Sequence, residues 1–235
     1  MSSWTDKKAV EITLKLRDEF KIKEFIETGT YTGVNAKFYS DKFEKVKSCE
    51  KVEEKLTQAL ERLNGINNVC LYHNSSPFFL KNFIRNYKKM DREDIVFIYL
   101  DAHFYDPRLP LKDRFAIKKE LKALEGFKNC IIAIHDFDNG ELGHIIYDNI
   151  HLDLKLIKKD LMKVNPEFKL YTNNKCDIVT PEEIKKGKIP LLDWNEEMES
   201  TMKFVWSNPI KTYRGILYAI PKELNLKKYD LRKHD

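Results

Sequence analysis

The chain has 235 residues, of which 42% are hydrophobic and 34% are charged, and its formal net charge is +5 at pH 7. This size and composition predict one domain with a sizeable core and a soluble surface, and the interspersed acidic and basic residues argue against a nucleic-acid footprint. No apolar run reaches the roughly 18 residues of a membrane-spanning helix, and residues 1–6 hold no apolar signal region, so we expect a cytoplasmic protein without a membrane partner.

Along the chain, turn residues separate short apolar runs from segments with helical periodicity. Predicted helices cover residues 5–20, 34–41, 51–63, a segment that starts at 74–77, 111–125 and 152–164. Predicted strands cover residues 24–27, 46–50, 69–73, 94–100, 130–134, 168–172 and 214–220. The alternation predicts an α/β fold, a Rossmann-like and mostly parallel sheet flanked by helices, and the fully apolar run at 94–100 is typical of its central strand.

The loop after the first predicted strand has the pattern of a ligand-binding turn. Residues 25–33 read Phe-Ile-Glu-Thr-Gly-Thr-Tyr-Thr-Gly, so an apolar strand ends at Glu27 and enters a turn bounded by Gly29 and Gly33. Glycine lets the backbone turn tightly and removes the Cβ that would block close approach. A helix that starts near Val34 directs its partly positive N-terminus at the same place. A tight loop without a ligand is the alternative.

Polar side chains recur where each predicted strand ends. Glu27 is followed by Glu50, then by Asn74, then by Asp101-Ala102-His103, and then by His135-Asp136. The carboxyl ends of parallel strands open onto the ligand crevice of such sheets. Glu50 lies 23 residues after Glu27, close to the spacing at which an acidic residue accepts the ribose hydroxyls of a nucleotide. Each residue alone is better explained as a solvated strand end or a helix cap, but five in succession on a parallel sheet favour a ligand site.

Four motifs resemble those of class I S-adenosylmethionine-dependent methyltransferases, and more narrowly those of small-molecule and sugar O-methyltransferases. The motifs are Glu27-Thr28-Gly29-Thr30-Tyr31-Thr32-Gly33, Ser48-Cys49-Glu50, Tyr99-Leu100-Asp101-Ala102-His103 and Ile132-Ala133-Ile134-His135-Asp136-Phe137. The run at 213–221 resembles the closing strand of that group. The resemblance covers residues 20–150 and 166–221, apart from the segment 173–212.

The resemblance implies that S-adenosylmethionine binds at the carboxyl edge of the sheet. The residues assigned to the cofactor are Glu27, Thr28, Gly29, Thr30, Tyr31, Gly33, Glu50, Asn74, Ser75 and Asp101. By this assignment Glu27 and Gly29 lie beneath the methionine part and Glu50 holds the ribose. Asn74 and Ser75 face the adenine. Two positions depart from the family pattern, because Tyr31 replaces a glycine and Asn74 replaces an aspartate.

The candidate catalytic side chains are Asp101, His103, His135 and Asp136, and the resemblance assigns roles to the two aspartates. Asp101 would stand beside the methyl group and the acceptor. His103 and His135 are both candidates for the general base, since an imidazole titrates near neutral pH, and a structural hydrogen bond is the alternative for each. In the most similar relatives, acids at the positions of Asp101 and Asp136 hold Mg²⁺. His135 stands where those relatives have another acid, which leaves a softer divalent ion or no metal open.

The segment 173–213 is the one long irregular region, and such regions are usually functional. We expect it to form a cap inserted before the last strand of a single methyltransferase domain that spans residues 1–235. Its side chains Trp194 and Trp206 are candidates to bind the substrate by stacking on a sugar ring. A plain surface excursion is the alternative. The basic residues at 227–233 are interpreted as a frayed tail.

The leading hypothesis is an O-methyltransferase (EC 2.1.1.-) that acts on a small hydroxylated acceptor such as a sugar or glycan. A cofactor-binding protein without transfer activity is one alternative, and a nucleic-acid or protein methyltransferase is another. A nicotinamide dehydrogenase is disfavoured because the Gly-x-Gly-x-x-Gly fingerprint is absent. The acceptor, the metal and a homodimeric state are left open.

Overall fold

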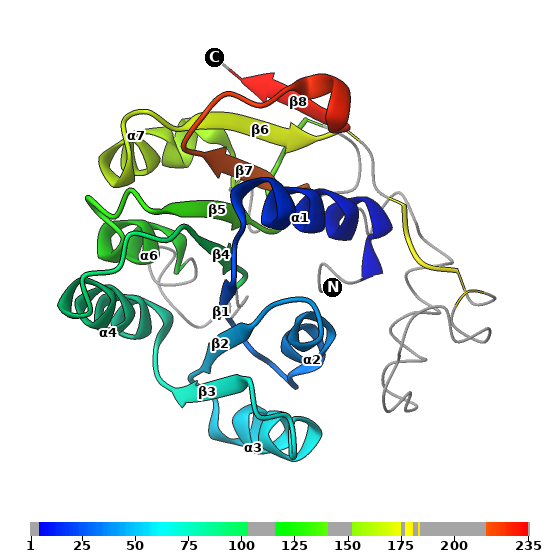
Figure 1. The fold of residues 1–235 in the computed structure, drawn as a ribbon, viewed down its shortest axis with the longest axis vertical. Coiled ribbons are helices and arrows are strands. Elements are labelled where there is room, and N and C mark those ends of the chain that lie inside the picture. The colour runs from blue at the N-terminus through cyan, green and yellow to red at the C-terminus, as the bar shows by residue number, and fades with distance from the viewer. Residues whose placement is uncertain are drawn as a thin grey trace.

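The fold is built around one eight-stranded sheet in the order β3-β2-β1-β4-β5-β7-β6-β8 (Figure 1). The computed structural model describes residues 5–102, 116–140, 152–174, 177–180, 183 and 215–234. The strands are β1 Glu24–Thr28, β2 Lys45–Glu50, β3 Val69–His73, β4 Val96–Leu100, β5 Cys130–Ile134, β6 Lys169–Asn173, β7 Leu217–Ile220 and β8 Leu231–His234.

Strands β1 to β5 run parallel, as the alternation of strands and helices predicted. Strand β7 lies antiparallel between β5 and β6, and β8 lies antiparallel to β6. The order reverses at β1, which has β2 on one side and β4 on the other. In open α/β sheets a ligand crevice forms at such a reversal, outside the carboxyl ends of the strands.

Helices cover both faces of the sheet (Figure 1). They are α1 Lys7–Phe20, α2 Val34–Ser40, α3 Glu53–Arg62, α4 Ser76–Lys89, α6 Ile117–Ala123 and α7 Leu154–Val164, with a short 3₁₀-helix at Leu226–Lys228. Helices α1, α2 and α3 lie on one face, and α4, α6 and α7 lie on the other. None of the helices in the described ranges is both long enough and apolar enough to cross a membrane.

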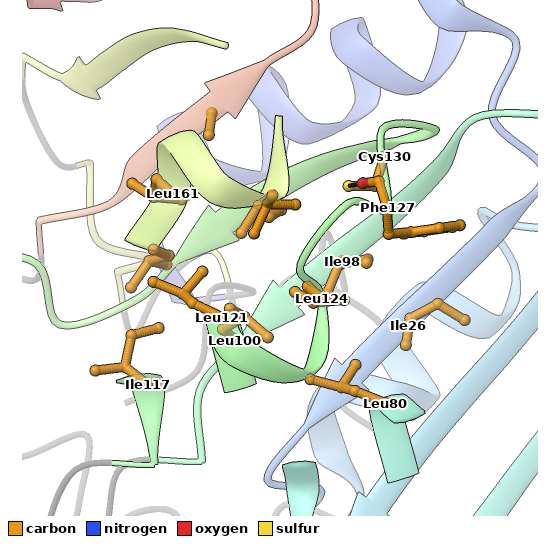
Figure 2. Close-up of a cluster of buried hydrophobic side chains, with 14 of the residues drawn as sticks. Ile26, Leu80, Ile98, Leu100, Ile117, Leu121, Leu124, Phe127, Cys130 and Leu161 are labelled. Atoms are coloured by element: carbon orange, nitrogen blue, oxygen red, sulfur yellow. Dashed lines mark hydrogen bonds between the residues drawn. The ribbon is translucent and has the colours of Figure 1, made fainter. Parts of the chain in front are cut away.

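Alternation along each strand divides the core into two layers. Figure 2 shows the layer beneath α4, α6 and α7, where Ile26, Ile98 and Leu100 of the sheet meet Leu80, Leu121 and Leu161 of the helices. The other layer mixes aliphatic side chains with tyrosine and phenylalanine rings, and the rings of Phe25 and Tyr39 stack at 4.4 Å between centroids. Every residue of β4 is buried, which confirms that this apolar run is a central strand.

The C-terminal segment is an ordered strand, so the interpretation as a frayed tail is wrong. Leu231–His234 forms β8 along the free edge of β6, and the Leu231 side chain is buried. The side chains of Thr172 and His234 are hydrogen-bonded at 2.8 Å, and Arg232 donates to the backbone carbonyl of Asn139. The strand predicted at 214–220 is therefore next to last, and β8 protects an edge that would otherwise be open.

Candidate active site

Four neighbouring parallel strands deliver polar side chains to one edge of the sheet. Strands β2, β1, β4 and β5 are adjacent, and they end at Glu50, Thr28, Leu100 and Ile134. The acidic residues and the histidine predicted from the sequence either lie at the ends of these strands or directly follow them. The topology therefore brings together, at one edge, residues that are more than 100 positions apart in the chain.

The turn after β1 fits closely against the end of β4. Gly29 has a φ of +82°, and a Cβ there would lie 2.6 Å from the carbonyl oxygen of Asp101. The Asp101 amide donates to the backbone oxygen of Thr28 and to its Oγ1, both at 3.2 Å. The amides of Gly29 and Thr30 both donate to the carbonyl of Cys49 at 3.0 Å. These two amides hold the turn against β2, and the glycine is needed for the approach of Asp101.

Glu50 links this turn to the following helix through three backbone hydrogen bonds. Its carboxylate accepts from the amides of Tyr31, Lys51 and Val52, each at 2.9 Å. Tyr31 has a left-handed φ of +50° and is 52% exposed, a conformation that is costly for a non-glycine residue. A carboxylate offers about four acceptor positions, so about one remains at Glu50 for a ligand hydroxyl.

Glu27 is buried and held by two side chains that the sequence analysis missed. Its carboxyl accepts from Asn35 Nδ2 and from Ser48 Oγ, both at 2.6 Å, and Ser48 Oγ is also 2.6 Å from Thr30 Oγ1. Burial raises the pKa of Glu27 to about 8; the bonds from Ser48 and Asn35 oppose this rise, and the charge of Asp101 adds to it. Glu27 is therefore mostly protonated at neutral pH. In the sequence, each of the partners Asn35 and Ser48 could be recognised only as a polar residue on an otherwise buried face of its helix or strand.

Asp101, His135 and Asp136 form a compact cluster where β4 and β5 end. His135 Nδ1 lies 3.1 Å from Asp101 Oδ1 and 3.2 Å from Asp136 Oδ1. The Asp101 side chain is 20% exposed, whereas the His135 and Asp136 side chains are 3% and 8% exposed. Asp101 is thus the most exposed member of the cluster, and His135 is buried beside it. Ligand atoms of all three lie within 4.8 Å of one another, as a metal site requires.

The remaining predicted residues lie further from this cluster or outside the described residues. The Asn74 amide donates to the Glu50 carbonyl at 3.1 Å, which places Asn74 beside the end of β2. Ser75 is the N-cap residue of α4 and is exposed. Gly33 is the N-cap residue of α2. His103, Trp194 and Trp206 lie outside the described residues.

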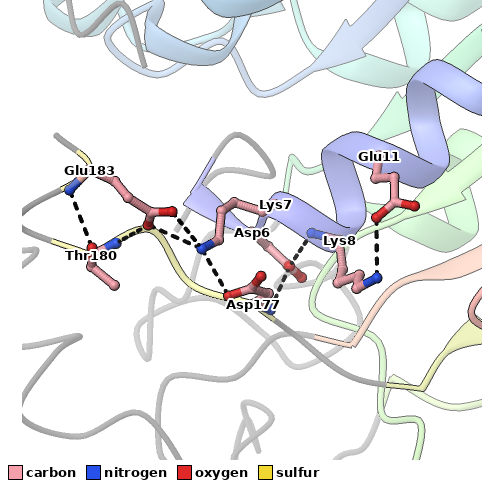
Figure 3. Close-up of polar contacts among 7 residues, drawn as sticks. All are labelled: Asp6, Lys7, Lys8, Glu11, Asp177, Thr180 and Glu183. Atoms are coloured by element: carbon pink, nitrogen blue, oxygen red, sulfur yellow. Dashed lines mark hydrogen bonds and ion pairs between the residues drawn. The ribbon is translucent and has the colours of Figure 1, made fainter. Parts of the chain in front are cut away.

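The start of α1 is tied to the segment that follows β6 (Figure 3). The Asp6 carboxylate accepts from the amides of Lys8 and Asp177 at 3.0 Å, and burial raises its pKa. Lys7 Nζ lies 3.1 Å from Asp177 and 2.9 Å from Glu183. Residues 177–180 of the predicted cap are therefore held against the N-terminus of α1.

Comparison with solved structures identifies the fold. The methyltransferase domain of bacterial CtHen1-CN aligns with a TM-score of 0.50 at 10% identity, over 91% of this chain and 98% of that one. The plantazolicin methyltransferase BamL, in complex with a triazolic desmethylPZN analogue and S-adenosylhomocysteine (SAH), aligns with a TM-score of 0.50 at 12% identity, over 94% and 86%. No protein-family model and no curated protein sequence matches the chain. The chain has the class I methyltransferase fold.

Proposed function

We propose that this protein transfers a methyl group from S-adenosylmethionine to a small hydroxylated acceptor. The observation that carries the proposal is the position of Glu50 and Asp101 at the ends of β2 and β4, on both sides of β1 where the strand order reverses. The same fold in BamL holds SAH, the product that methyl transfer leaves behind. At 12% identity this likeness supports the class of cofactor. The class of acceptor has to be inferred from the residues of the site.

The residues at the crevice fit a cationic nucleoside. Glu50 has about one acceptor position left, which suits a ribose hydroxyl. Asp101 adds a partly exposed carboxylate on the other side of β1, and a carboxylate favours a nearby positive charge. Glu27, below the turn, gains a charge if a cation lowers its pKa. The bound cofactor supplies a methyl group on a positively charged sulfur.

Asp101 is the side chain best placed to take the acceptor proton. Its carboxylate is the exposed member of the cluster, and the His135 ring holds its Oδ1 from behind. The bound cofactor would supply the methyl group to the acceptor oxygen and would leave as SAH, and Asp101 would take the proton of the acceptor hydroxyl. His135 orients the carboxylate and, through Asp136, is itself held in place. The base role first considered for His135 is then a positioning role.

A sugar or glycan is the acceptor class we propose, and Trp194 and Trp206 are its proposed contacts. Flat indole faces stack on sugar rings, and a closing segment excludes water from the transfer step. Trp194→Ala and Trp206→Ala, made separately, should leave cofactor affinity unchanged while at least one raises the acceptor KM severalfold. If both only lower the melting temperature, these tryptophans have a packing role.

A divalent cation at Asp101, His135 and Asp136 is a second proposal at the same place. Two carboxylate oxygens and one imidazole nitrogen are a mixed donor set, which Mg²⁺ disfavours and Mn²⁺ or Zn²⁺ accepts. Calorimetric titration with Mn²⁺ and Mg²⁺ should show tighter binding of Mn²⁺, and Asp136→Asn should weaken it. Equal, millimolar binding by the wild-type protein and the variant would exclude a built metal site.

The cofactor proposal is tested by calorimetry with S-adenosylmethionine, SAH and NAD. We expect micromolar binding of the first two, weakened by Glu50→Ala by about 1–3 kcal/mol through lost charge-assisted hydrogen bonds. Binding of NAD alone would overturn the proposal. Binding of the cofactor without turnover on a panel of sugars, peptides and RNA would favour a cofactor-binding protein instead.

A further inference from the structure

A groove lies between α4 and the strands β2 and β3, and it reaches the end of β3 at Asn74. Its volume is about 230 Å³, and its lining includes Lys47, Tyr72, Phe79, Asn82, Arg85 and Asn86. Drug-sized ligands occupy pockets of roughly 300–1,000 Å³, so this groove suits a single ring system with its substituents.

The groove has an aromatic wall that is open to solvent. The Tyr72 ring is 36% exposed and lies 5.1 Å from the Phe79 ring, at an interplanar angle of 43°. Phe79 is buried and fixes one side of the wall. Because Tyr72 belongs to the edge strand β3, nothing in the described part of the chain pairs with the other side of that strand. A flat ligand ring can therefore stack on Tyr72.

Positive charge beside this wall is not compensated. Between Glu61 and Asp91 the chain has no acidic residue, and α4 alone carries Lys81, Arg85, Lys88 and Lys89. Within the described ranges, the side chain of Arg85 makes no ion pair or hydrogen bond. Lys47, by contrast, is neutralised by the buried Glu24 at 2.6 Å. Arg85 is thus the cation that an anionic ligand would meet.

Amide side chains complete the lining. Asn82 and Asn86 lie one turn apart on α4, and Asn74 stands at the end of β3. An amide both donates and accepts hydrogen bonds, as the edges of nucleobases do. A purely acidic peptide would use the arginine but would need neither the stacking face nor paired donors and acceptors.

We propose that this groove binds a nucleotide unit, with its base against Tyr72, its base edge on Asn82 and Asn86 of α4 and its phosphate on Arg85. Proteins that bind single-stranded nucleic acid combine stacking aromatics with a basic track in this way. The unit can be a free nucleotide or part of a single strand. The balanced total charge led us to expect no nucleic-acid partner, and α4 is a local exception to that balance. The proposal does not depend on methyl transfer.

The test uses fluorescence anisotropy of the full chain with a labelled oligouridylate of about twelve nucleotides. Arg85→Glu should weaken binding about tenfold and reduce the slope of log affinity against log salt by about one. Tyr72→Ala should weaken binding about tenfold, and Tyr72→Phe should retain it. Lys159→Glu, a charge reversal at an exposed position of α7, is the matched control and should change little. Tyr72 and Arg85 are both exposed, so melting temperatures should stay unchanged.

Competition identifies the source of the nucleotide. If uridine monophosphate displaces the probe, free nucleotides are ligands; if only unlabelled strand displaces it, the ligand is a strand. Saturating SAH should leave probe binding unchanged. Displacement by SAH, equal losses in Lys159→Glu and Arg85→Glu, or polyglutamate binding that ignores Tyr72→Ala would each overturn the proposal. Failure of SAH to bind at all bears on the proposed function alone.

Discussion

Replacing Glu27 by glutamine should remove a large pH dependence of stability. Burial raises the pKa of the Glu27 carboxyl from 4.5 to about 8. Between these values the folded protein keeps a proton that the unfolded chain has released, so stability falls as pH rises through that window and levels off above it. Each pH unit costs up to about 1.4 kcal/mol, which makes the full effect about 3–5 kcal/mol.

The glutamine amide reproduces the hydrogen bonds of the protonated acid. Its oxygen would accept from Asn35. Its nitrogen would donate to Ser48 Oγ, the reverse of the bond in which Ser48 donates to Glu27, and Ser48 can donate on to Thr30. Glu27→Gln should therefore match the wild-type protein near pH 5 and exceed it by several kcal/mol near pH 9.

Urea unfolding followed by circular dichroism at about pH 5, 7 and 9 measures this difference. Glu54→Gln is the matched control, because the Glu54 side chain is 76% exposed on α3 and its loss should not alter the pH profile. Parallel pH profiles for the wild-type protein and Glu27→Gln would refute the reasoning, since the carboxyl would then titrate alike in both states. A variant that is unstable at every pH would show that the charged form is required.

Substitutions at three further positions test the geometry of the site. Asp101→Asn should keep the melting temperature and lower methyl transfer at least about tenfold, because the amide keeps the shape but cannot take a proton; loss of the fold would make the carboxylate structural. Glu50→Ala should also lower the free energy of unfolding by about 2–4 kcal/mol in urea titrations, since three backbone amides lose their acceptor. An unchanged free energy of unfolding would mean that water replaces the carboxylate as the acceptor. Tyr31→Val should lower the free energy of unfolding by about 1–2 kcal/mol and Tyr31→Gly should not, because the backbone at position 31 is left-handed. A Tyr31→Val variant as stable as the wild-type protein would show that the turn adopts another conformation.

The sequence by itself determined the order of the elements and the sheet edge at which the polar candidate residues gather. Periods of two and of 3.6 residues are local properties, so they can be recognised without knowledge of any partner. The polar residues that end each apolar run follow the same logic, and Glu50 and Asp101 lie where the pattern placed them. The absence of acidic residues between Glu61 and Asp91 can also be seen in the sequence alone. Its significance depends on Tyr72 lying beside α4 in the structure.

Only the tertiary structure decided the states and roles of these groups. β8 has too few apolar residues to be recognised, and it forms because β6 presents an open edge. Glu27 was expected beneath the cofactor, and burial raises its pKa against the opposing hydrogen bonds from Ser48 and Asn35, which reach it from β2 and α2. Asp101 and His135 are 34 positions apart, and burial alone distinguishes the accessible group from the one behind it. Exposure, pKa and contact distance arise from the surroundings of a side chain, and those surroundings come from distant parts of the chain.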